Sequence, residues 1–162
     1  MKLSRRSEIF NPLSRHKSTE AVKVLLQRGA DPSIPDDETE TALLFAARRG
    51  YKDIAALLLE DIRTEVNYAD ARNLTPFHAA CSSGNRSLCE LLLKHGADLT
   101  AKTKNRLTGL HFAAFNGDDD ICELLVSTGI IQRYLLVKTR SYFGQIYVDL
   151  KGLGHAILSN FA

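Results

Sequence analysis

Residues 75–96 read TPFHAACSSGNRSLCELLLKHG, and two further copies of this stretch flank it. One copy starts thirty-three residues later with TGLHFAA at Thr108, and the other starts thirty-four residues earlier with TALLFAA at Thr41. Similarity at a fixed period of roughly 20 to 50 residues is typical of stacked repeat arrays, in which no unit buries its apolar face alone. The sequence therefore predicts a repeat array built from short helices.

The phrase Thr-Pro-Phe-His-Ala-Ala at 75–80, the leucine run at 91–93 and Gly-Ala-Asp at 96–98 resemble the ankyrin repeat. The resemblance covers roughly residues 18–129. It implies an all-α, ankyrin-repeat solenoid of helix-turn-helix units with β-turn or hairpin connections. It also implies that the fixed residues build the stack, while the turn tips and the exposed face of each first helix vary with the partner.

The repeats differ in quality along the chain. Pro12 lies inside the first expected helix and Lys17 replaces the expected glycine, so we expect a degenerate first repeat with a basic N-terminal arm. A helix from Ser18 is clearer, with Ala21, Val24, Leu25 and Leu26 at helical spacing. The expected units are 1–35 for the degenerate repeat, 36–69, 70–102 and 103–130 for three better formed repeats, and 131–162 for a tail.

The tail departs from the repeat pattern. Ile146 and Tyr147 would fill two positions shaped for alanine, and bulky side chains there push the helices apart. The run 142–148 is aromatic and β-branched, which favours a strand over a helix. We therefore expect residues 131–162 to be a divergent tail or cap, which either folds over repeat four or belongs to a part missing from this chain.

Charge is distributed unevenly around a net value of +2. Residues 1–28 contain seven lysines and arginines and two aspartates and glutamates. The corresponding numbers are ten and sixteen in residues 29–129, and four and one in residues 130–162. The acidic middle argues against nucleic acid as the partner, because nucleic-acid affinity depends on clustered cations. No apolar run reaches the roughly 18 residues of a membrane span, and no secretory signal is recognisable. We expect an intracellular protein, cytoplasmic or nuclear.

Three groups of residues invite a chemical interpretation. Cys81, Cys89 and Cys122 are best interpreted as buried thiols in a reducing compartment, with a disulfide or zinc site as the alternative. The acidic run 118–120 opens a helix, where negative charge complements the helix dipole, and metal binding is the lesser alternative.

His78 and His111 recur one repeat apart. The resemblance implies that they hydrogen-bond the backbone between neighbouring repeats rather than act as catalysts or ligands. The sequence has no His-Glu-x-x-His, no Gly-x-Ser-x-Gly and no Gly-rich phosphate loop. We therefore expect that the protein is not an enzyme, has no catalytic residue, and binds no cofactor or metal.

The variable positions of the resemblance give the candidate partner-binding residues. At the turn tips they are Asp37, Glu38, Glu40, Ala71, Arg72, Leu74, Lys104, Asn105 and Leu107, and before each helix-ending glycine they are Arg48, Arg49, Ser82, Ser83, Phe115 and Asn116. Leu74, Leu107 and Phe115 are the apolar members, and exposed apolar anchors on one face are what a protein-binding site requires. The alternative is that these three side chains only cover their own loops.

These residues predict a monomeric adaptor that binds a partner protein through the concave face of the array. The alternative is a regulatory or targeting fragment of a larger channel or enzyme. Asn67, in a Val-Asn loop, is a candidate for asparaginyl hydroxylation, because this loop is the modified site in some ankyrin-like proteins. In the central repeat we expect Leu91 to be buried between helices.

Overall fold

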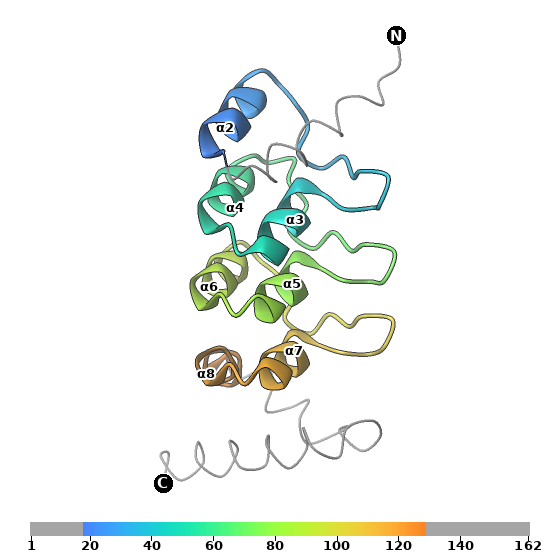
Figure 1. Cartoon of the computed structure of the whole chain (residues 1–162), viewed down its shortest axis with the longest axis vertical. Coiled ribbons are helices and arrows are strands. Elements are labelled where there is room, and N and C mark those ends of the chain that lie inside the picture. Colours follow the sequence, from blue (N-terminus) through green and yellow to red (C-terminus); the bar gives the residue numbers. More distant parts are fainter. Residues whose placement is uncertain (1–17, 129–162) are drawn as a thin grey trace, which may run out of the picture.

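The computed structural model describes residues 18–128. Within this range the structure contains seven α-helices and no strand. In chain order they are α2 (Thr19–Gln27), α3 (Ala42–Arg49), α4 (Lys52–Leu59), α5 (Pro76–Ser82), α6 (Arg86–Lys94), α7 (Gly109–Asn116) and α8 (Asp119–Ser127). Figure 1 shows α3, α5 and α7, which we call the inner helices, in one column and α2, α4, α6 and α8, the outer helices, in a second. A loop projects beside each inner helix. The expected all-α repeat array is confirmed.

A threonine precedes each inner helix, and in α3 and α5 its hydroxyl accepts a hydrogen bond from the first turn. The Leu44 N–H donates to the Thr41 hydroxyl at 3.3 Å, and the His78 N–H donates to the Thr75 hydroxyl at 3.4 Å. These bonds satisfy backbone donors that the first helical turn leaves unpaired. Gly50 and Gly117 end α3 and α7 in the left-handed conformation, at φ 68° and 73°. The inner helices are short because each is bounded by residues that stop it.

Both columns contain small as well as large buried side chains. Ala46, Ala47, Ala80 and Ala113 have no exposed surface, which lets neighbouring inner helices approach closely. The largest fully buried aromatic and aliphatic side chains are Phe45, Phe77, Leu43, Leu44, Ile54, Leu58, Leu88, Leu92, Ile121 and Leu125. Burying such a side chain contributes roughly 1.5–3 kcal/mol. One continuous core therefore runs through the stack.

Two expectations about the outer helices have the wrong register. In α6, Leu88 and Leu92 are fully buried four residues apart, whereas Leu91 is only half-buried. In α2, Val22 is the fully buried residue and Val24 is 48% exposed. Three or more consecutive apolar residues fit several helical faces, so composition alone did not select the face that packs inward.

Each projecting loop is the same five-residue turn, at 36–40, 70–74 and 103–107. The first residue exchanges backbone hydrogen bonds with the fourth and fifth: in the last turn, the Thr103 N–H donates to Leu107 O (2.9 Å) and the Arg106 N–H to Thr103 O (2.8 Å). The fourth residue adopts positive φ in all three turns, at 61° for Thr39, 58° for Asn73 and 63° for Arg106. Asparagine tolerates this conformation better than arginine or β-branched threonine. The tips are therefore rigid, and two of them carry local strain.

Several expectations fall on residues outside the described range. They concern the first expected helix around Pro12, the basic arm, and the strand-like run and cap function of the tail. Within residues 18–128, no helix has the length and apolar character needed to cross a membrane.

Candidate partner-binding face

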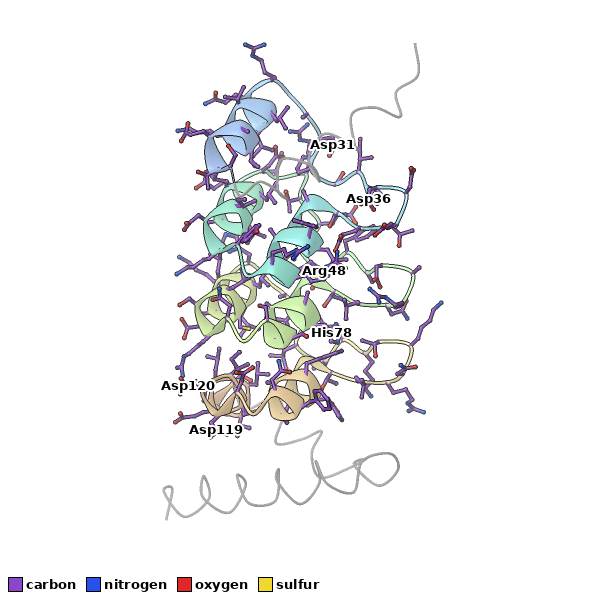
Figure 2. All side chains as sticks on the ribbon, in the orientation of Figure 1. Asp31, Asp36, Arg48, His78, Asp119 and Asp120 are labelled. Atoms are coloured by element: carbon purple, nitrogen blue, oxygen red, sulfur yellow. The ribbon has the colours of Figure 1, made fainter. Side chains whose placement is uncertain are left out.

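The three tips and the exposed C-terminal ends of the three inner helices form one surface, which we call the inner face. It consists of residues 36–40, 70–74 and 103–107 together with 48–49, 82–83 and 115–116. Figure 2 shows Asp36 and Arg48 on the tip side of the stack, whereas Asp119 and Asp120 lie on α8 at the opposite side. All fifteen candidate partner-binding residues belong to this face by their place in the repeat.

Two positions of the repeat define the middle of the inner face. Glu40, Leu74 and Leu107 close the three turns, and Arg48, Ser82 and Phe115 stand eight residues further on in each repeat. In repeat two these positions touch, because the Arg48 guanidinium binds the Glu40 carboxylate at 2.6 Å. By register the same two positions carry leucine and phenylalanine in repeat four. The inner face thus changes from an ion pair to apolar side chains along the stack.

Glu40 differs from the exposed acidic tip residue that the sequence suggested. It is 5% exposed and pairs with Arg48, whereas Asp37 and Glu38 are exposed. Burial raises the pKa of Glu40 above its ordinary value, and the Arg48 guanidinium offsets part of that rise. Glu40 and Arg48 neutralise each other here, so they contribute less rim charge than two separate ions would.

The next two tips carry basic side chains. Ala71 and Arg72 are exposed, and the Arg72 guanidinium lies 3.2 Å from the Asp70 carboxylate. In the last tip Lys104, Asn105 and Arg106 are all exposed. Arg106 was not among the candidate residues predicted from the sequence for this tip. The alternation Lys102-x-Lys104-x-Arg106 was the signal that could have found it.

The three apolar candidates differ in exposure. Phe115 is 76% exposed at the end of α7. Leu74 and Leu107 are half-buried, and Leu74 packs against the core. The alternative to partner binding was that these side chains only cover their own loops. The partial burial of Leu74 fits that alternative better than the high exposure of Phe115 does.

The remaining helix-end candidates are exposed and held in place. The Asn116 amide donates to Ser82 O at 2.8 Å, which links α7 to α5. The Ser83 hydroxyl donates to Ala80 O at 2.9 Å. The guanidinium carbons of Arg48 and Arg49 lie 5.9 and 5.5 Å from the centre of the buried Phe45 ring, within the range of a cation–π contact. These contacts limit the conformations available to the helix ends.

The two histidines have structural partners. The Thr75 N–H donates to His78 Nδ1 (3.2 Å), so His78 Nε2 carries the proton and donates to Ala101 O (3.0 Å), near the end of the same repeat. This bond ties α5 to the segment that leads into repeat four, whereas a bond to a neighbouring repeat was expected. His111 Nδ1 accepts from the Thr108 N–H at 3.2 Å, and the equivalent of Ala101 for this residue lies outside the described range. Burial lowers the pKa of both histidines.

The three cysteines are buried free thiols, as expected. Cys81 Sγ and Cys89 Sγ are 3.8 Å apart. Contact with Cys89 and burial raise the pKa of the Cys81 thiol far above its ordinary value, and burial raises the pKa of Cys122 to about 11. Thiols with such pKa values are poor nucleophiles. Among residues 18–128, no group of three or more His, Cys, Asp or Glu is arranged to hold a metal ion.

Asp118 precedes α8, but its side chain accepts no hydrogen bond from that helix. Its Oδ2 is buried and has no hydrogen-bond partner within the described residues. Asp119 and Asp120 occupy the first turn of α8, where their charge complements the helix dipole as expected.

Asn67, the candidate modification site, joins the loops of two repeats. Its side-chain amide donates to Gly96 O at 3.0 Å, and its Oδ1 accepts from the Asp98 N–H at 2.8 Å. Asn67 is exposed in spite of both bonds. It is therefore reachable from solvent but held by its amide group.

Comparison with known proteins agrees with the repeat geometry. A family model for ankyrin repeats in three copies matches residues 13–103, and a single-repeat ankyrin model matches residues 105–135. Similar proteins include Delta-latroinsectotoxin-Lt1a of Latrodectus tredecimguttatus, 34% identical over 56% of this chain and 8% of the toxin. Human BCL-6 corepressor-like protein 1 is 32% identical over 59% of this chain and 5% of its own length. Serine/threonine-protein kinase 12 of Arabidopsis thaliana is 36% identical over 52% of this chain and 18% of the kinase. The matched region is less than a fifth of each of these relatives.

Proposed function

The chain belongs to the ankyrin-repeat family, and on that premise we propose that it acts as an adaptor that binds a partner protein through its inner face. Ankyrin repeats are generally protein–protein interaction modules, and the proteins similar to this chain contain such repeats. The adaptor role, the face and the fifteen binding residues are our proposal. We include in it that the chain is monomeric, binds no nucleic acid, performs no catalysis and works inside the cell.

The exposure of Phe115 carries the proposal. A phenylalanine that is 76% exposed leaves a large apolar area in water, and the scaffold uses arginine and serine at the equivalent positions. Apolar anchors of this kind supply much of the binding energy in protein interfaces, and phenylalanine is enriched there. Phe115 stands beside a charged and polar rim, which is the usual arrangement of such an interface.

Rigidity supports the same proposal. The Ala71 N–H donates to the Thr39 hydroxyl at 3.1 Å, and the Lys104 N–H donates to Arg72 O at 3.0 Å, so the three tips are tied together. A surface that is ordered before binding loses little conformational entropy when the partner arrives. A few anchors then suffice for a stable complex.

Affinity capture with matched variants tests the proposal. The inner-face variant is Arg49→Glu/Phe115→Ala, and the control is Lys52→Glu/Ile62→Ala on α4 and in the loop that follows it. Both variants change charge by the same amount and remove one exposed apolar side chain, since Ile62 is fully exposed. We expect the wild type and the control to capture the same partner from source-cell extract, and the inner-face variant to lose it. Equal capture by all three proteins would contradict the proposed face.

The lengths of the relatives support the second candidate function. The chain matches a short part of proteins that include one named as a serine/threonine-protein kinase, so it can be a regulatory or targeting part of a larger channel or enzyme. In that case residues 129–162 would bind a domain absent from this chain. Hydrogen exchange of the isolated chain tests this, because a tail that belongs elsewhere exchanges freely. A protected tail would contradict this alternative.

Hydroxylation of Asn67 remains a separate proposal. The exposed side chain supports it, and the two amide hydrogen bonds imply that the loop must open before an enzyme can reach the Cβ atom. Mass spectrometry of the natural protein should find one added oxygen on the peptide that contains Asn67. The unmodified mass alone, at full sequence coverage, would contradict it.

A further inference from the structure

The two sides of the array carry different charge. The segments that supply the tips and inner helices, 36–49, 70–83 and 102–116, contain six lysines and arginines against five aspartates and glutamates. The rest of residues 18–128 contains six against twelve. The acidic character that argued against nucleic acid thus belongs mainly to the outer helices and their loops. The inner face has to be judged by its own charge.

The imbalance is greatest at repeat four. Residues 102–116 contain Lys102, Lys104 and Arg106 and no aspartate or glutamate. Arg72 and Arg48, in the preceding repeats, pair with Asp70 and Glu40. Within residues 18–128, no carboxylate is within ion-pairing distance of the side chain of Lys104 or Arg106. These two cations remain available to carboxylates from another molecule.

The backbone holds these cations next to the apolar part of the face. The Lys104 N–H is fixed to Arg72 O at 3.0 Å, and the Arg106 N–H to Thr103 O at 2.8 Å. Leu107 follows Arg106 directly and is half-buried. Phe115 occupies the position from which Arg48 reaches Glu40 in repeat two, and Leu107 is the equivalent of Glu40. The register therefore places the exposed Phe115 ring on the same side of repeat four as the basic tip.

We propose that the repeat-four end of the inner face binds an acidic segment of a partner protein, with an apolar side chain against Leu107 and Phe115 and carboxylates against Lys104 and Arg106. This inference rests on the proposed function and adds the chemistry of the partner. The same segment would be repelled by the acidic outer helices, so the charge pattern selects the face as well as the partner. Complementary charge of this kind speeds association and excludes wrong partners.

Charge also argues against the chain's own termini as the occupant. Residues 1–17 contain five lysines and arginines against one glutamate, and residues 129–162 contain four against one aspartate. Both segments have the same sign of charge as the repeat-four tip. Neither segment therefore supplies the acidic occupant.

Selection from a display library of random peptides, each about 15 residues long, identifies the preferred chemistry without bias. We expect peptides rich in aspartate and glutamate that contain an aromatic or aliphatic residue. A labelled consensus peptide should bind about tenfold or more weakly to Lys104→Glu and to Phe115→Ala, and within about twofold of wild type to Lys52→Glu and Ile62→Ala. Raising salt from about 0.05 M to about 0.3 M should weaken binding by slowing association.

Other outcomes would overturn the inference, and they show separately whether the proposed function holds. Basic or uncharged peptides that lose affinity with Phe115→Ala and keep it with Ile62→Ala overturn the acidic partner but retain the inner face. Equal binding to all four variants overturns both. Three further results would also overturn the inference. They are competition of a labelled RNA for the same site, self-association of the chain that Lys104→Glu abolishes, and the recovery of no peptide from the library. The capture experiment would then decide the proposed function alone.

Discussion

Asp118 and Asn85 stand at the same position of successive repeats, and their different side chains lead to different bonding. The Asn85 amide donates to Gly50 O at 3.0 Å, while its Oδ1 accepts from the Leu88 N–H at 3.0 Å. One side chain thus links two repeats and caps α6. The Asp118 carboxylate lies against Gly84, where a Cβ atom would be 3.3 Å from its oxygens, but it has no proton to donate. A buried acceptor without a donor costs about 1–3 kcal/mol.

We therefore expect Asp118→Asn to stabilise the array by about 1 kcal/mol, because asparagine can donate to Gly84 O as Asn85 does to Gly50 O. Urea unfolding of the two proteins measures the difference. Asn85→Asp is the matched reverse change and should lower stability. A loss of stability in Asp118→Asn would contradict this account of the buried oxygen.

Gly109 stands where the helix-starting proline of the repeat is found at Pro76, and its surroundings explain the exchange. A Cβ atom on Gly109 would lie 2.9 Å from both Cys81 Sγ and Phe77 Cε1. Phe77 and Cys81 are fully buried, so neither can move aside into solvent. The phenylalanine in repeat three and the glycine in repeat four are therefore a fitted pair.

Gly109→Ala should destabilise the protein by about 1–3 kcal/mol, because overpacking outweighs the better helix propensity of alanine. A double-mutant cycle with Phe77→Leu checks the cause. The cost of alanine at 109 should shrink in the Phe77→Leu background. An unchanged cost there would place the clash elsewhere.

His78 makes stability depend on pH. Its folded-state pKa is lowered by burial, so the unfolded chain binds a proton more readily than the folded chain. The contribution of His78 to the free energy of unfolding is then fully present above the ordinary histidine pKa of about 6.5. It falls as the pH drops below that value, by at most about 1.4 kcal/mol per pH unit for each such histidine. His111 adds a second contribution of the same sign.

We expect the free energy of unfolding to fall between pH 7 and pH 5. His78→Gln should be less stable at pH 7, because the link to Ala101 is altered, but should show a shallower decrease. Urea unfolding at three pH values compares the slopes. Parallel slopes for the two proteins would contradict the role of His78.

At the scale of the element, the outer helices show how burial depends on register. Leu88, Cys89 and Leu92 of α6 are fully buried, and Leu91 and Leu93 are half-buried. The leucines of the run point to several sides of the helix, so the sequence did not determine which of them is buried. The prediction that Leu91 is buried was wrong. Helix α6 packs against α5 of its own repeat as well as against the outer helices α4 and α8, and these neighbours together decide which side packs inward.

Leu92→Ala should cost about 2–5 kcal/mol, the usual range for a fully buried leucine. Leu91→Ala should cost clearly less, because part of its surface is already in water. Urea unfolding of both variants gives the ranking. Equal losses would show that Leu91 is as much a part of the core as Leu92.

At the scale of the whole molecule, the sequence predicted the architecture well and the site unevenly. The period, the threonine caps and the glycine stops follow local rules, so the helix order could be read from one chain. The link from Asn67 to Asp98 and the close packing around Gly109 depend on contacts between repeats, and the ion pair between Glu40 and Arg48 joins a turn tip to the end of the helix that follows it. Such contacts need the stacking geometry, which a list of residues does not contain. Arg106 of the repeat-four tip was absent from the candidate residues, although its neighbours Lys104, Asn105 and Leu107 were among them.

The central claim is that the inner face, rather than the outer helices, is the binding surface. Hydrogen exchange of the chain with and without the captured partner tests it most directly. Our account predicts slower exchange at 103–107 and at the end of α7, with the loops at 60–66 and 95–100 unchanged. Slower exchange confined to those loops or to α4, α6 and α8, with the tips unaffected, would contradict it.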